Sequence, residues 1–241
     1  MASDLPDINA VRKALREHAR PTAAETAAWY FKAGPGEYGE GDRFLGIEVP
    51  HTREVARRAR AIPWDRVPAL LRSPWHEERL CALILWVNRF PKADQPEQEE
   101  IVRAWLAHAR WINNWDLVDS SAPHLLGRWL ASRPEERDIL DRLAASPTLW
   151  ERRMAIVATH ALIREHQFED TLRLARTLLD DPEVLIHKAT GWMLREVGIL
   201  AFDLEVGFLD EHYTRMPRTM LRYAIEKFPE PLRQDFLRGN R

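Results

Sequence analysis

The stretch "LWERRMAIVATHALIREH", Leu149 to His166, predicts an amphipathic helix with a cation near its start, Arg153, followed by small apolar residues. The same marker, a cation and then small apolar residues, recurs at Arg79, Lys188 and Arg222. The separations are 74, 35 and 34 residues, and half of 74 falls on Asp116. A period of about 36 residues with two helices in each unit is typical of an α-solenoid of HEAT or armadillo type.

Outward from this stretch, nearly every segment predicts an amphipathic helix that ends at Pro, Gly, Asp or Ser, and no segment has the alternation of a strand. We therefore expect an all-α fold, with residues 1–241 forming a single domain of HEAT-like repeats. Such stacks of helices present a concave face that serves as an extended binding surface. The markers are cations except at Asp116, which indicates a positive face interrupted by one acidic region or, alternatively, ordinary solvated helix faces.

Composition and charge limit the function classes. The 241 residues are 45% hydrophobic, carry a formal net charge of −2 and contain one cysteine, Cys81, in an apolar run. No apolar stretch has the length of a membrane span, and the N-terminus does not resemble a signal peptide. We expect a soluble, cytoplasmic protein, monomeric and without a membrane partner. Binding to nucleic acid would depend on clustered cations, because the whole molecule is slightly acidic.

The stretch "RWINNWDLVDSSAPHLLG", Arg110 to Gly127, is the first candidate for a chemical site. As one helix, it would place Trp111, Trp115 and Asp119 on one face, with Pro123 bending the helix one turn later. Asp116 has a structural explanation at a helix start capped by a preceding asparagine, whereas Asp119 would lie inside the helix and need a partner or a function. Tryptophans at helical spacing are more often core residues than site residues.

A second candidate region supplies cations and a ring. In "HKATGWMLREVG", Lys188, Trp192 and Arg195 share one helical face, an arrangement that suits a sugar-phosphate backbone. The predicted DNA-binding track extends this set with the adjacent Arg152 and Arg153 and with Arg218 and Arg222. The Gly-rich connection "AGPGEYGEGDRFLGIEVP", residues 33–50, is either an irregular loop or a loop that contacts a ligand.

Several reaction classes lack their motifs. The sequence has no His-Glu-x-x-His, Cys-x-x-Cys, phosphate-binding Gly loop or Gly-x-Ser-x-Gly elbow, so we expect no metal and no cofactor.

Three segments in this order, "NWDLVDSSAPHLLG", "LWERRMAIVATHALI" and "KATGWMLREVG", resemble the AlkD-type alkylpurine DNA glycosylases, a family with a HEAT-like repeat fold. The segment "AAWYFKAGPGEYGEGDRFLGIEVPHTREV" is similar to the opening of that family, with a longer Gly-rich insertion. The resemblance spans residues 27–228. It implies a monofunctional glycosylase that removes cationic N3- or N7-alkylated purines from duplex DNA.

Carried over by motif, the family's essential acid falls on Asp119 and its aromatic neighbour on Trp115. The family's arginine falls on Arg153, its second sugar-packing ring on Trp192, and a further aromatic residue near DNA on Tyr30. Two alternatives stay open: a HEAT-repeat protein that binds DNA without excising bases, and a protein-binding HEAT scaffold.

Overall fold

The structure, a computed structural model, describes residues 4–241 and is all-α, as predicted. Within these residues the only β-type pairing is an isolated bridge between Arg43 and Trp75. The chain divides into a first compact unit that ends at Ser121 and a second unit, Ala122–Arg241. The single domain over residues 1–241 stays a prediction.

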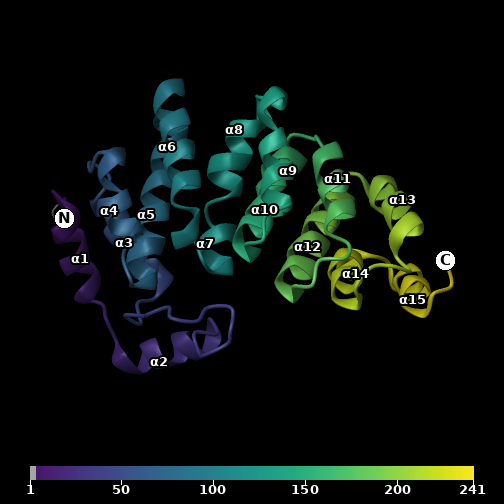
Figure 1. Cartoon of the computed structure of the whole chain (residues 1–241), viewed down its shortest axis with the longest axis horizontal. Coiled ribbons are helices and arrows are strands. Elements are labelled where there is room, and N and C mark those ends of the chain that lie inside the picture. Colours follow the sequence, from purple (N-terminus) through teal and green to yellow (C-terminus); the bar gives the residue numbers. More distant parts are fainter. Residues whose placement is uncertain (1–3) are drawn as a thin grey trace. The chain divides into compact units, whose positions relative to one another are not determined.

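The first unit contains seven α-helices among its described residues (Figure 1). They are α1 (Ile8–Arg16), α2 (Pro21–Tyr30), α3 (Val49–Arg58), α4 (Pro68–Leu71), α5 (His76–Arg89), α6 (Gln95–Ala107) and α7 (Trp115–Asp119). Short 3-10 turns lie at Trp64–Arg66, Phe90–Lys92 and Ala109–Trp111.

The second unit begins with a π-helix, Pro123–Gly127, labelled η4. It continues through α8 (Arg128–Ala131), α9 (Asp138–Ala144), α10 (Leu149–Arg164), α11 (Glu169–Thr177), α12 (Val184–Leu200), α13 (Phe202–His212), α14 (Arg218–Ala224) and α15 (Glu230–Arg238). The remaining 3-10 turns are Pro134–Glu136 and Ile225–Lys227.

The predicted repeat is visible in the helices. Arg79, Arg153, Lys188 and Arg222 lie in the first two turns of α5, α10, α12 and α14, respectively. In the second unit, α10 packs on α12 and α12 packs on α14, as expected of consecutive repeats. Gly191 permits the second contact, because a Cβ there would lie 2.3 Å from the carbonyl oxygen of Met220.

The tryptophans separate into core and surface residues. Trp86 and Trp105 are fully buried, and Trp129 and Trp150 nearly so, which confirms the core interpretation for these four. Trp115 and Trp192 are only partly buried, and Trp29 is exposed. The two rings singled out as site residues are therefore accessible, unlike the tryptophans of the core.

The apolar face of each unit is buried among its own helices. In the second unit, a cluster that includes Leu194, Phe208, Leu221 and Phe236 joins α12, α13, α14 and α15. In the first unit, Val11, Val55, Leu83 and Trp86 from α1, α3 and α5 are almost fully buried. No helix among residues 4–241 is both long and apolar enough to cross a bilayer.

Candidate nucleic-acid interface and the buried site beside it

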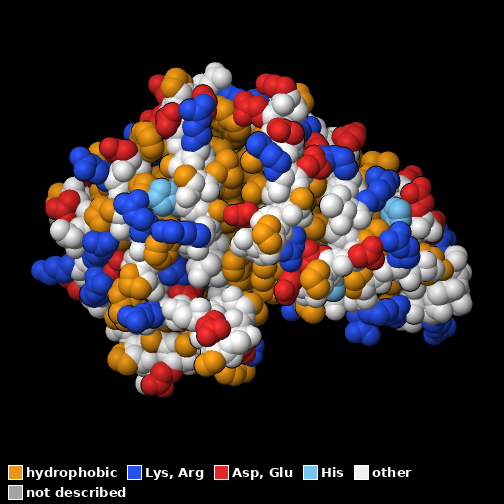
Figure 2. Space-filling model, viewed as in Figure 1, with side chains coloured by type: hydrophobic (Ala, Val, Ile, Leu, Met, Phe, Trp, Pro, Cys, Tyr) orange, Lys and Arg blue, Asp and Glu red, His pale blue; other side chains and the backbone are white. Residues whose placement is uncertain are grey.

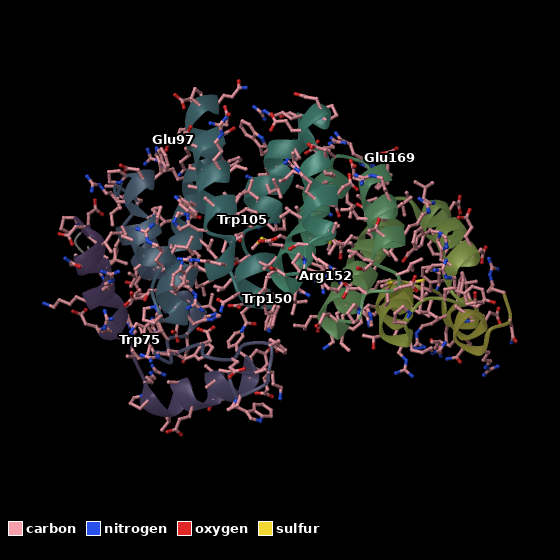
Figure 3. The ribbon with its side chains drawn as sticks, in the orientation of Figure 1. Trp75, Glu97, Trp105, Trp150, Arg152 and Glu169 are labelled. Carbon is pink, nitrogen blue, oxygen red and sulfur yellow. The ribbon has the colours of Figure 1, made fainter. Side chains whose placement is uncertain are left out.

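Helix α7 is short and is fixed at both ends. At its start, the side-chain oxygen of Asn114 accepts a hydrogen bond from Trp115 N (2.9 Å), and its amide nitrogen donates to the Phe31 carbonyl (3.2 Å). At its end, the Trp105 indole, labelled in Figure 3, donates to the Ser121 hydroxyl (3.1 Å), which donates to the Leu117 carbonyl (2.7 Å). These bonds hold Trp115 and Asp119 in place, and Asn114 is the N-cap that the sequence predicted.

The prediction of one helix through Trp111, Trp115, Asp119 and Pro123 is wrong. Trp111 ends a 3-10 turn, α7 begins at Trp115, and Asp119 is the last residue of α7. A turn follows, and Pro123 starts the π-helix η4. Proline cannot donate the bond that would continue the ladder, so the interruption falls immediately after the acid.

Trp115 belongs to an aromatic cluster of the first unit. Its ring lies 5.4 Å from the Phe31 ring in a stacked arrangement and 5.9 Å from the Tyr30 ring in an edge arrangement. Tyr30 is 54% exposed at the end of α2. The structure therefore brings together Trp115 and Tyr30, which are 85 residues apart in the sequence.

Sequence analysis did not find a buried charged set next to this cluster. His76 hydrogen-bonds through Nδ1 to Asp42 (2.8 Å) and through Nε2 to Asp116 (2.8 Å). Arg79 donates to the other oxygen of Asp42 (2.6 Å). The ring of His76 also lies between 4.8 and 4.9 Å from those of Phe44 and Phe31.

These contacts correct the interpretation of Arg79 as part of an exposed positive face. Arg79 is 3% exposed and neutralises Asp42. Burial acts to raise the pKa of Asp42, but the His76 hydrogen bond and the charges of Arg79 and His76 outweigh it and hold that pKa below its usual value. The partners come from the Gly-rich loop, α5 and α7, so no single stretch of sequence contains the set.

The protonated His76 makes stability depend on pH. Burial alone would lower the pKa of His76, but the hydrogen bonds and charges of Asp116 and Asp42 raise it from 6.5 to about 9. The imidazolium therefore stabilises the folded state fully below pH 6.5, and we expect this contribution, about 3 kcal/mol, to be lost as pH rises through about 9. In urea unfolding at pH 6, 7.5 and 9, His76→Gln should be less stable than the wild type, with a difference that shrinks as pH rises. A difference that stays constant over this range would contradict the linkage.

In the second unit, Trp192 stands among polar side chains of α10 and α12. Its indole nitrogen donates to Glu196 (3.0 Å), and its ring lies 5.9 Å from that of His160. Arg195 forms ion pairs with Glu196 and Glu226. Sequence analysis did not select His160 or Glu196, although an i, i+4 spacing from Trp192 could have indicated Glu196.

The two adjacent arginines of α10 are both engaged. Arg152, labelled in Figure 3, pairs with Asp181 (2.6 Å). Arg153 is 5% exposed, and its Nη1 donates to the Leu185 carbonyl (2.6 Å). Both stay predicted site residues, but Arg152 already binds the segment before α12 and Arg153 already binds the first turn of α12.

The other cations of the predicted track differ in availability. Arg218 is exposed and donates one hydrogen bond to the Leu237 carbonyl. Lys188 is partly exposed, Arg222 is exposed, and neither forms an ion pair with another residue in the described part of the chain. Cations and anions are mixed over the face seen in Figure 2, so a positive surface would be local.

The cysteine and the possible metal ligands do not form a reactive centre in the described residues. Burial, with the charge of Glu78, raises the pKa of the Cys81 thiol to about 12, so this thiol is an inert core group. Residues 4–241 contain no cluster of three or more His, Cys, Asp or Glu side chains arranged to hold a metal ion.

A family model described as "DNA alkylation repair enzyme" matches residues 11–228. The chain belongs to this family. The matched range includes Tyr30, Trp115, Asp119, Arg153 and Trp192. No curated protein matches the sequence.

Two solved structures are similar to this DNA alkylation repair family member. One is a predicted DNA alkylation repair enzyme from Enterococcus faecalis, at 17% identity and a TM-score of 0.71, covering 88% of this chain and 98% of that one. The other belongs to a family described as related to the HEAT-like repeat DNA glycosylases, with affinity for branched DNA structures, at 14% identity and a TM-score of 0.61. It covers 97% of this chain and 95% of the other. These likenesses confirm the predicted HEAT-like helical repeat fold.

Proposed function

We propose that this protein is a monofunctional DNA glycosylase that removes cationic N3- or N7-alkylated purines from duplex DNA by hydrolysis of the N-glycosidic bond. The observation that carries the proposal is helix α7, in a member of the DNA alkylation repair family, with Trp115 at its start and Asp119 at its end. Trp115 stands with Tyr30 in an aromatic cluster whose rings are partly exposed.

The chemistry needs few groups. An N7- or N3-alkylated purine is already cationic, so it leaves as a neutral base and needs no general acid. Its departure produces a sugar with oxocarbenium character, which a carboxylate stabilises. In the proposed mechanism, Asp119 provides this charge and orients the water that attacks C1′. Trp115 packs its electron-rich face on the sugar as positive charge develops, and Trp192 keeps the sugar-packing role that the family resemblance implies.

The direct test is incubation of the purified protein with duplex DNA that contains 7-methylguanine, followed by detection of free base and abasic sites. Release of 7-methylguanine, with undamaged guanine retained, is the expected result. If neither free base nor abasic sites form while the duplex is bound, the excision proposal fails.

A second candidate is a protein that binds DNA without excising bases. The likeness to a family with affinity for branched DNA favours it. Tight binding to a four-way junction, with no release of base from any alkylated duplex, would select this function over the first.

Binding to DNA should depend on Lys188 and Arg222, two cations of the track for which residues 4–241 provide neither an ion pair nor a side-chain hydrogen bond. Each phosphate contact contributes about 0.9 to the slope of log affinity against log salt concentration. We therefore expect Lys188→Ala and Arg222→Ala each to reduce that slope by about one for all sequences alike. Arg195→Ala should change it less, because Glu196 and Glu226 already neutralise this arginine. Salt titrations of binding to an undamaged duplex give the slopes, and equal slopes in all four proteins would remove these cations from the interface.

A further inference from the structure

A pocket of about 400 Å³ lies within the first unit, between α2 and the helices α3 and α5. Figure 1 shows α2 running across the lower ends of α1, α3 and α5. The Gly-rich connection closes one side of the pocket with Phe44, Gly46, Ile47 and Glu48. The volume is in the range of pockets that hold small organic ligands.

Hydrogen bonds hold the loop that forms one wall of this pocket. Glu77 accepts hydrogen bonds from the backbone nitrogens of Leu45 (2.9 Å), Gly46 (2.8 Å) and Ile47 (3.1 Å), which fixes the loop against α5. Gly46 has a φ of 75°, and a Cβ there would lie 2.2 Å from the Arg20 carbonyl oxygen. Glycine at this position thus lets the loop pass directly under the start of α2.

Helix α2 supplies an apolar wall that the first unit covers only in part. None of its residues is buried, although most are alanine or aromatic. Ala23, Ala27 and Tyr30 line the pocket, and Trp29, 72% exposed, stands at its edge. An amphipathic helix usually buries its apolar face, so a half-buried apolar face that lines a formed pocket points to a ligand.

The rings on both sides favour a flat occupant. Phe31 and Phe44 stack on each other at 5.3 Å with an interplanar angle of 10° and both line the pocket, as do Tyr30 and Trp29. Aromatic rings arranged in this way offer their faces or edges to another ring at little entropic cost.

The charges that line the pocket disfavour an anion. Its charged lining consists of the carboxylates of Glu48, Glu77 and Asp116 and the imidazolium of His76, and Arg20 pairs with Glu48 (3.1 Å). Oδ1 of Asp116 is buried and has no hydrogen-bond partner, so the carboxylate surplus is not fully compensated. A phosphate or carboxylate ligand would be repelled, whereas an uncharged or cationic ring would be accepted.

We propose that this pocket binds a planar aromatic ring system, uncharged or cationic. The proposal does not depend on base excision. Two sources share this chemistry: a free aromatic small molecule, and an aromatic group carried on a damaged DNA base. The second source is geometrically reasonable because Tyr30 and Phe31, which line the pocket, also contact Trp115.

The test uses proflavine, a flat tricyclic cation, and anthracene-9-carboxylate, a tricyclic anion of similar shape, each titrated into the DNA-free protein by calorimetry. We expect saturable proflavine binding with a Kd of roughly 10⁻⁴ M or tighter. Anthracene-9-carboxylate should bind at least about ten times more weakly, because of the carboxylate lining. Absence of saturable proflavine binding, or equal affinity for the two probes, would overturn the proposal.

A substitution that fills the pocket tests whether proflavine binds there. Ala27→Phe places a ring in the pocket and should weaken proflavine binding at least about tenfold. Thr22→Phe is the matched control, because Thr22 is an exposed residue of the same helix that does not line the pocket. Thermal unfolding of both variants checks that they fold. Equal affinities in the two variants would place proflavine elsewhere and reject the pocket.

A second arm distinguishes the sources. Duplexes with 7-benzylguanine or 7-methylguanine on a 2′-fluoro sugar, which slows loss of the base, are compared for affinity. If the ring on the base enters the pocket, the wild type prefers the benzyl duplex and Ala27→Phe abolishes that preference. If the preference is absent while proflavine binds the wild type, the occupant is a free small molecule and not a group on a DNA base. Because proflavine binding is measured without DNA, a failure of base excision leaves this result intact.

Discussion

Asp119→Asn is expected to reduce release of 7-methylguanine by about 10³-fold, equivalent to about 4 kcal/mol of transition-state stabilisation. Asparagine has nearly the shape of aspartate but lacks the charge that stabilises the sugar cation. Affinity for the same duplex should change less than about threefold, because phosphate contacts made elsewhere dominate it. Single-turnover release of free base and equilibrium binding, measured on the same preparation, give the two numbers.

Asp203→Asn is the control for this experiment, since Asp203 is an exposed aspartate at the start of α13 and belongs to neither candidate set. It should release base at the wild-type rate. Asp119 also has contacts within the folded chain, so the unfolding free energy of Asp119→Asn must be compared with the wild type. Full activity of a folded Asp119→Asn protein would remove this carboxylate from the mechanism.

The repeat could be predicted from the sequence because it depends on local periodicity. Arg153 and Lys188 are 35 residues apart and occupy equivalent places in α10 and α12. What periodicity could not predict was the direction of each side chain. Arg79 carries the same marker but lies buried against Asp42, since the loop that brings Asp42 there has no periodic pattern.

The continuous helix through Trp111 and Trp115 was an error of the same origin. Four-residue spacing is satisfied by these residues, but two asparagines stand between them, and Asn114 uses its side chain to cap a new helix. A capping residue competes with helix continuation because it satisfies the free N–H groups locally. Trp115 and Asp119 do share the helix α7, while Trp111 belongs to a different element.

The buried set around His76 could not be predicted from any one segment. Asp42, His76 and Asp116 are separated by 34 and 40 residues, and each has an ordinary local explanation. Only the tertiary structure places both carboxylates on the two nitrogens of one imidazole. The same holds for the pocket under α2, whose lining comes from α2, the Gly-rich loop, α3, α5 and α7.

Glu205→Gln is expected to stabilise the protein, by an amount that grows with pH. Glu205 is 1% exposed in α13, and its Oε1 has no hydrogen-bond partner among the described residues. Burial raises its pKa from 4.5 to about 9, although the charge of Arg195 acts to lower it. The folded state therefore binds a proton that the unfolded state releases above pH 4.5, so stability falls as pH rises from 4.5 towards 9.

Through this linkage the wild type is about 3 kcal/mol less stable at pH 7 than at pH 4.5. Glutamine has the same shape and no charge, so Glu205→Gln avoids this loss. In urea unfolding at pH 5, 7 and 8.5, the free energy of unfolding of Glu205→Gln should exceed that of the wild type by an amount that grows with pH. Asp203→Asn, which changes an exposed acid on the same helix, should have the pH dependence of the wild type. The pH range differs from that of His76→Gln, because the stability contribution of Glu205 begins to change near pH 4.5 and that of His76 near pH 6.5. A Glu205→Gln protein whose stability runs parallel to the wild type across this range would show that Glu205 is ionised in the folded state, with Arg195 as its counter-charge.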